Sequence, residues 1–175
     1  MSSPPARDRD AAGRARNARP RDGLGRPLPR SAAGDGRPNP DDLPNPDDLR
    51  IPDDLVIAPA EAAELGARLL AEGRPFHAHE VFEAAWKSVP GPDRELWRGL
   101  AQIAVGLTHA RRGNTSGAVA LLRRGAGHVA QFAGSSREVD AGYAAAQATD
   151  LAVRIDRDGL AGVPEADLLV RLRRG

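Results

Sequence analysis

The sequence lacks cysteine and contains one lysine among its 175 residues. Without cysteine, disulfide bonds and thiolate metal sites are excluded, and the composition is compatible with the reducing cytoplasm. All six aromatic residues lie at or after position 76, so the N-terminal third has few large apolar side chains with which to build a core. The single lysine accompanies 24 arginines and abundant alanine and glycine, which indicates a biased nucleotide composition. The high arginine content therefore does not by itself indicate a function.

Long apolar runs are also missing. No stretch approaches the about 20 apolar residues that span a bilayer, and the first thirty residues lack the apolar segment of a secretory signal peptide. Counted by segment, residues 1–37 carry a net charge of +5, residues 38–55 carry −5, and residues 56–175 carry +1. A nearly neutral core argues against a nucleic-acid-binding surface. We therefore expect a cytoplasmic protein without membrane or nucleic-acid partners.

Residues 1–55 are rich in proline, glycine, arginine and aspartate and show no helical or strand periodicity. Such a segment cannot bury enough apolar surface to offset its ordering entropy, which predicts a disordered tail. Within it, Pro-Asp-Asp-Leu occurs three times, starting at Pro40, Pro46 and Pro52. The repeats fit a duplicated linker, or an acidic peptide that docks on a basic surface or folds back on the arginine-rich tail.

From position 59 the apolar residues follow helical spacing, and no segment shows the alternation of a strand. The predicted helices span 59–73, 75 to about 89, about 94–112, 114 to about 132, about 138–156, and a short segment after Pro164. Asp93 is expected to cap the third helix. Short connections favour antiparallel neighbours. The predicted fold class is therefore all-α, a compact antiparallel bundle of five to six helices in residues 56–175.

The segment 75–86 concentrates two histidines, two glutamates, two phenylalanines and a tryptophan in one predicted helix. His79 and Glu83 are four residues apart, so their side chains are neighbours on the helix surface. Trp86 lies two turns beyond His79 on the same stripe and is expected to be largely buried beside Phe82. His77 is expected to face solvent. Charged groups held close to apolar surface are typical of functional sites.

Three interpretations of His79 remain open. It is a structural histidine held by Glu83, a ligand of a divalent metal shared with Glu83, or part of a non-metal acid–base or small-ligand site. The zincin motif would need a second histidine at position 83, and a dimetal bundle would need Glu-x-x-His pairs on two helices. A catalytic zinc typically has three protein ligands, and the third would have to come from Glu80, His109 or another chain. We assign no metal and no cofactor.

Gln102 and His109 lie seven residues apart on the third predicted helix, hence on one face. A buried amide without a partner costs about 1–3 kcal/mol. We therefore expect the side chain of Gln102, and with it that of His109, to contact the side chains of His79 and Glu83. The alternative is that Gln102 bonds only to backbone or water.

Three motifs occur in order along these helices: Ala-His-Glu-x-x-Glu-x-x-Trp at 78–86, Gly-Leu-Ala-Gln at 99–102 and Gly-Asn-x-x-Gly-Ala at 113–118. Together they resemble a bacterial and archaeal family catalogued only as domain of unknown function 309, over about residues 60–130. The resemblance implies a small all-α domain with signature positions at His79, Glu80, Glu83, Trp86 and Gln102. It implies no established activity. Family members often carry another residue where His77 stands, so it assigns His77 no role.

Two classes of function follow from these residues. In the first, a non-enzymatic helical module binds a protein or small-molecule partner through His79, Glu80, Glu83, Trp86, Gln102 and His109. In the second, a hydrolase-like enzyme uses His79, Glu80 or Glu83 with a metal or with a general base. The enzyme would need a water nucleophile, because cysteine is absent and the serines lie mainly in tails and turns. We favour the binding module. The sequence does not define the oligomeric state.

Overall fold

The computed structural model describes residues 55–132 and 138–174, and every regular element in these ranges is a helix. The elements are α1 (Pro59–Ala71), α2 (Pro75–Ser88), α3 (Asp93–Arg111), α4 (Thr115–Ala130), α5 (Ala141–Asp158), and the single 3-10 turns η2 (Leu160–Gly162) and η3 (Glu165–Asp167). The all-α prediction is confirmed. The predicted sixth helix is one 3-10 turn. The predicted disordered tail and its repeats lie outside the described residues, apart from Leu55, which packs against the core.

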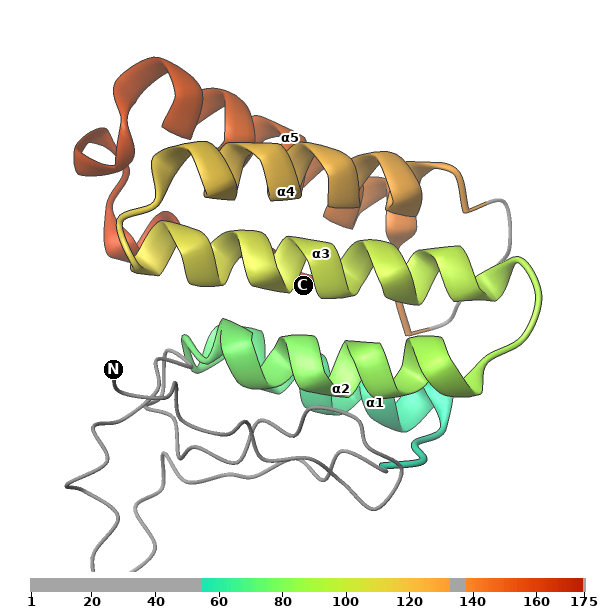
Figure 1. Cartoon of the computed structure of the whole chain (residues 1–175). Coiled ribbons are helices and arrows are strands. Elements are labelled where there is room, and N and C mark those ends of the chain that lie inside the picture. Colours follow the sequence, from blue (N-terminus) through green and yellow to red (C-terminus); the bar gives the residue numbers. More distant parts are fainter. Residues whose placement is uncertain (1–54, 133–137, 175) are drawn as a thin grey trace, which may run out of the picture. The chain divides into compact units, whose positions relative to one another are not determined.

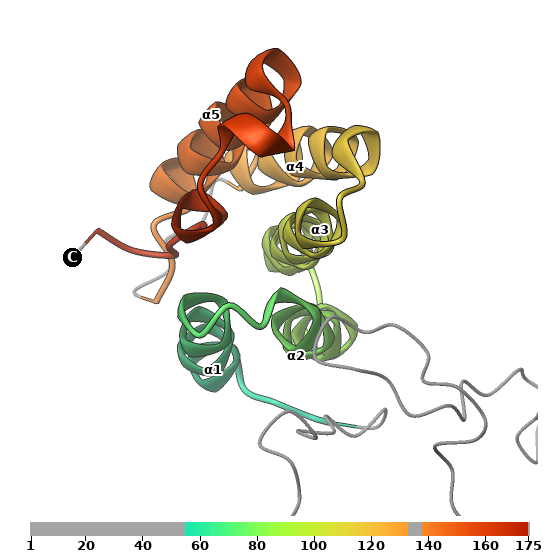
Figure 2. The same ribbon diagram turned by 90° about the vertical axis from the view of Figure 1, so that its left-hand side faces the viewer.

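Consecutive helices run antiparallel and each packs against the next (Figure 1). In Figure 2, α1 to α3 are seen nearly end-on, and the segment after α5 lies on the inner side of the curve that the helices follow. This C-terminal segment is part of the core, because Val163, Leu168, Val170 and Leu172 are all buried.

Hydrogen bonds from α5 hold the C-terminal segment in place. The Gln147 amide donates to the Arg171 carbonyl oxygen at 2.8 Å and accepts from the Arg171 backbone N–H at 3.2 Å. The backbone N–H of Asp140 donates to the carbonyl oxygen of Leu172 at 2.8 Å. These bonds satisfy the polar backbone of an irregular segment that the core would otherwise leave unpaired.

Proline and glycine determine most helix boundaries. Pro59 and Pro75 occupy the first positions of α1 and α2, where a missing N–H costs nothing. Gly73 and Gly113 have φ values of 72° and 76°, a conformation that glycine adopts without a Cβ clash, and each follows a helix end. The prediction that Asp93 caps α3 was wrong. Asp93 is the first residue of α3 and Pro92 is the N-cap, so its carboxylate supports the helix N-terminus through charge.

The third helix lies between α2 and α4 and is apolar on most faces, as predicted. Its ring partner on α2 is Phe82, whose centroid lies 6.2 Å from that of Trp97. Both side chains are buried. Among the described residues, no helix has the length and apolar character needed to cross a membrane.

Glycines allow α3 and α4 to approach until their backbones touch. A Cβ added to Gly99 would lie 2.8 Å from the Gly125 carbonyl oxygen and 2.6 Å from Val129 Cγ2. A Cβ added to Gly125 would lie 2.7 Å from the Gly99 carbonyl oxygen and 2.9 Å from the Ile103 nitrogen. Because the obstructing atoms include backbone, they cannot move aside cheaply. The close contact therefore requires glycine at both positions.

We expect Gly99→Ala and Gly125→Ala each to lower the free energy of unfolding by about 1–3 kcal/mol, since an added methyl group would push the helices apart. Gly127 is the matched control, because it lies in the same helix as Gly125 and a Cβ there meets nothing within 4 Å. Gly127→Ala should instead stabilise the protein by about 0.5–1 kcal/mol. Urea denaturation of the three variants checks the contrast, and equal effects at 125 and 127 would contradict it.

Candidate functional site

Three titratable side chains form a row on α2. His79 Nε2 lies 3.5 Å from Glu83 Oε2, and Lys87 Nζ lies 3.1 Å from Glu83 Oε1. The side chains of His79 and Glu83 are 26% and 35% exposed, so the pair lies at the edge of the buried surface. The predicted contact between His79 and Glu83 is present. The participation of Lys87 was missed, although its spacing of four residues from Glu83 is the same signal.

The pKa of His79 is lowered from its ordinary value, mainly because burial disfavours the charged imidazolium. The Glu83 carboxylate acts in the opposite direction, and the Lys87 ammonium adds to the lowering. His79 is therefore neutral near pH 7. With Nε2 directed at a carboxylate, the favoured tautomer carries its proton on Nε2, which leaves Nδ1 as a hydrogen-bond acceptor.

The acceptor Nδ1 of His79 is buried and has no hydrogen-bond partner. The same is true of Gln102 Oε1 on α3. No hydrogen bond joins Gln102 to His79 or Glu83 among the described residues, so the predicted meeting of these groups is not found. A buried acceptor without a donor costs about 1–3 kcal/mol. One such acceptor therefore lies on α2 and a second on the adjacent helix α3.

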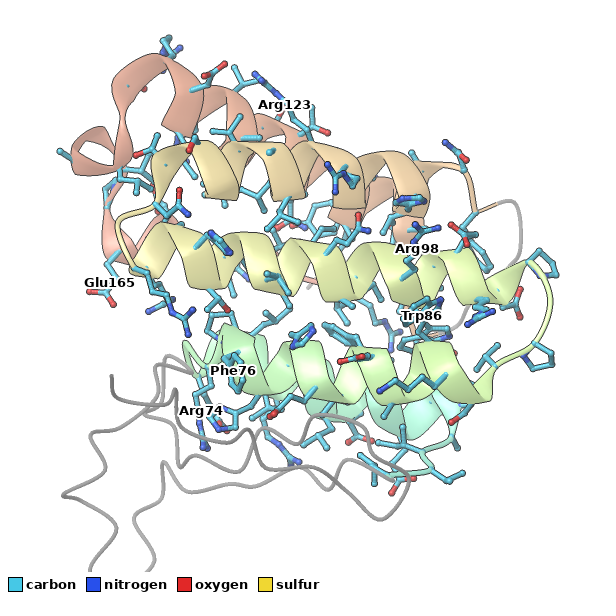
Figure 3. The ribbon with its side chains drawn as sticks, viewed as in Figure 1. Arg74, Phe76, Trp86, Arg98, Arg123 and Glu165 are labelled. Atoms are coloured by element: carbon cyan, nitrogen blue, oxygen red, sulfur yellow. The ribbon has the colours of Figure 1, made fainter. Side chains whose placement is uncertain are left out.

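Trp86 is largely buried, as predicted, although less completely than Trp97. It packs against the core but is not fully covered, because it lies in the last turn of α2. The Arg94 guanidinium covers it instead, 4.9 Å from the ring centroid, and Arg94 Nε donates to the Trp86 carbonyl oxygen at 3.2 Å. Figure 3 shows Trp86 of α2 and Arg98 of α3 at the same end of the domain. Trp86 thus combines an accessible aromatic surface with neighbouring cations.

His109 serves a different part of the fold from the one predicted. Its Nδ1 lies 2.7 Å from Asn114 Nδ2, and the Asn114 carboxamide oxygen accepts from the backbone N–H of Gly117 at 2.9 Å. A Cβ at Gly117 would clash with His109 Nδ1. His109 therefore supports the turn between α3 and α4, a local arrangement across a helix end that spacing within one helix does not reveal.

His77, two residues before His79, is more buried than predicted. His77 is 5% exposed, so the prediction that it faces solvent was wrong. That prediction assumed one buried stripe, whereas α2 packs against both α1 and α3. The Phe76 ring lies 5.8 Å from that of His77 and 6.0 Å from that of His79, centroid to centroid. Glu80 is half-buried.

Metal ligands and hydroxyl nucleophiles are the groups that the enzyme interpretation would require. Within ranges 55–132 and 138–174, no three or more histidine, aspartate or glutamate side chains are grouped so that they could hold a metal ion. The hydroxyls of Ser88, Thr108 and Thr149 each donate to the carbonyl oxygen four residues earlier, at 2.9 Å. Bonds of this kind occupy the hydroxyls within their own helices.

Comparison with known proteins finds a family match in the central part of the chain. Residues 63–121 match the family model of a domain of unknown function, DUF309. A relative, the uncharacterized protein YpuF of Bacillus subtilis (strain 168), is 46% identical over 48 residues, covering 27% of this chain and 28% of the relative. The match thus spans less than a third of that protein's length. No solved structure matches the chain.

The two tryptophans should differ in their contribution to stability. Trp97 is 3% exposed, so Trp97→Ala should lower the free energy of unfolding by about 3–5 kcal/mol. Trp86 is partly exposed, so Trp86→Ala should cost only about 1–3 kcal/mol. Chemical denaturation of both variants measures the difference. Equal losses would mean that Trp86 is a full member of the core.

His79 should make stability depend on pH. Since its folded pKa is lowered, the unfolded chain takes up a proton at higher pH than the folded chain does. The free energy of unfolding should therefore fall as the pH drops below about 6.5, and His79→Gln should lack this component. We expect the difference between wild type and His79→Gln, measured by urea denaturation, to be smaller at about pH 5 than at about pH 7. A larger difference at the lower pH would show that Glu83 dominates and favours the imidazolium.

Proposed function

Because the chain carries a DUF309 domain, for which the family description gives no activity, we propose a function from the site itself. We propose that the domain is a non-enzymatic binding module whose ligand donates a hydrogen bond to His79. The observation that carries this proposal is the buried, unpartnered Nδ1 of a neutral histidine whose other nitrogen faces a carboxylate. A donor from a ligand would remove the cost of leaving that acceptor unpaired.

The surroundings of His79 support a ligand with an aromatic or apolar part. Phe76 lies beside the imidazole, and Trp86 is partly exposed two turns further along α2. Aromatic side chains bury large apolar area at a low cost in conformational entropy. Gln102 supplies a second buried acceptor, Oε1, on the neighbouring helix. In this proposal Glu83 and Lys87 fix the orientation and charge of His79, and Glu80 lies next to it on the same helix.

Matched pairs of small molecules test the donor requirement on the full-length chain. Benzamide and phenol carry a donor on an aromatic ring, whereas N,N-dimethylbenzamide and anisole have the ring without the donor. We expect the donor compounds to bind at least about fivefold more tightly, which corresponds to about 1 kcal/mol for one hydrogen bond. Nitrogen chemical shifts of ¹⁵N-histidine-labelled protein provide the readout, because a new bond at Nδ1 changes the His79 signal directly.

Two controls accompany this titration. His79→Gln should remove the preference for donors, while His128→Gln should keep it, since His128 lies on α4 with its Nδ1 2.9 Å from Glu95. Lowering the pH below the pKa of His79 should also weaken binding, because a protonated Nδ1 no longer accepts. Equal binding of donor and methylated compounds would refute the proposed role of His79.

A hydrolase-like enzyme is the second candidate, because a neutral histidine held by a carboxylate is also the arrangement of a general base. In that case His79 would deprotonate a water and Glu83 would orient the ring. The occupied hydroxyls and the absence of a three-donor group in the described ranges favour the binding module. Metal analysis of the purified chain separates the two. One bound metal per chain, lost in both His79→Gln and Glu83→Gln, would favour a metalloenzyme.

A further inference from the structure

Two arginines come together at the end of the domain where α1 turns into α2 and α3 ends. Arg74 is the N-cap residue of α2 and Arg111 is the last residue of α3. A Cβ at Gly73 would lie 3.2–3.4 Å from the Arg111 guanidinium, so that group rests against the residue preceding Arg74. The two side chains are only 18% and 15% exposed. The Arg111 guanidinium thus lies beside the residue that precedes Arg74, and both arginine side chains have little water around them.

Three of the six side-chain nitrogen atoms of these arginines are unmatched donors. Arg74 Nε and Nη2, and Arg111 Nε, are buried without a hydrogen-bond partner. A guanidinium cannot escape this cost by losing its proton, and it has no acceptor of its own. On Arg74, Nε and Nη2 form one edge of the planar group, the edge that grips two oxygens of one anion side by side.

The nearby carboxylates leave that edge free. Glu165 Oε1 contacts Arg111 Nη1 at 2.9 Å, and Glu72 Oε2 lies 4.0 Å from Arg74 Nη1. The side chains of these glutamates are 81% and 48% exposed, so solvent screens both. Figure 3 shows Arg74 and Glu165 at the same end of the domain. Each glutamate therefore engages one terminal nitrogen and leaves the buried donors unpaired.

The start of α2 adds to the positive potential. The Arg74 side chain makes no cap hydrogen bond and the first turn of α2 contains no acidic residue. The unpaired N–H groups of a helix N-terminus carry partial positive charge. Two guanidinium groups beside such a terminus match an anion with several acceptor oxygens and more than one negative charge.

We propose that Arg74 and Arg111 form a binding site for a phosphate group, supplied as free phosphate or as part of a small phosphorylated molecule. The tetrahedral anion accepts from Nε and Nη2 of Arg74 and from Nε of Arg111. A phosphate suits the site better than a carboxylate, because its higher negative charge matches two guanidinium groups and its tetrahedral oxygens can face two separate donor planes. The site is separate from His79 and does not depend on the function proposed for it.

Calorimetric titration of the full-length chain with inorganic phosphate at low ionic strength tests the site. We expect a Kd below about 1 mM for the wild type. Arg74→Gln and Arg111→Gln should each weaken binding at least about tenfold, the effect of about 1.4 kcal/mol. Arg98→Gln is the matched control and should bind as the wild type does, because Arg98 is exposed and pairs with Glu95 in the first two turns of α3.

One further variant and one further ligand complete the titration. Arg74→Lys keeps the charge but loses the bidentate edge, and weaker binding in this variant separates a built site from general attraction. Phenyl phosphate that binds more tightly than inorganic phosphate identifies a phosphorylated molecule as the ligand, and equal affinities identify free phosphate. Circular dichroism confirms that each variant is folded. No binding to the folded wild type at about 10 mM phosphate, or an equal loss in Arg98→Gln, would overturn the proposal.

Discussion

The backbone contact between α3 and α4 is the constraint from which the rest of the domain follows. Gly99 and Gly125 fix not only the distance between these helices but also the rotation of α3 about its axis. Trp97 lies two residues before Gly99, about 200° around the helix, so it points away from α4 and towards Phe82 of α2. The same rotation places Arg98 and Gln102 on an outer, only partly covered side of α3. One pair of glycines thus decides which residues of the central helix build the core and which remain available.

The electrostatics of α2 depend on how far His79 is withdrawn from water. An exposed histidine four residues from a glutamate would gain a proton more readily. Here burial outweighs the carboxylate, and Lys87 competes for the same glutamate from the next turn. The result is a neutral imidazole with one nitrogen directed at Glu83 and the other enclosed without a partner. A chain with the same three residues on a fully solvated helix would lack this polarised arrangement.

Local sequence signals predicted the helices, and long-range packing decided the features that were missed. Proline, glycine and apolar spacing located five helices because those signals act within a few residues. The burial of His77 depends on which neighbouring elements cover α2, and periodicity on one helix carries no such information. The contact of Arg111 with Gly73 and Glu165 joins residues 38 and 54 positions apart. No spacing rule connects them, so the arginine pair could be found only in three dimensions.

The C-terminal segment changes how the helices behave as a unit. The five α-helices of the described residues pack mainly against their neighbours in sequence, as in a linear array whose ends can fray independently. The segment after α5 interrupts this pattern. It is bonded to α5 through Gln147 and reaches the end of α3 through Glu165 and Arg111. Local opening of α5 or of the end of α3 must therefore break contacts with this segment, which couples the two helices during unfolding.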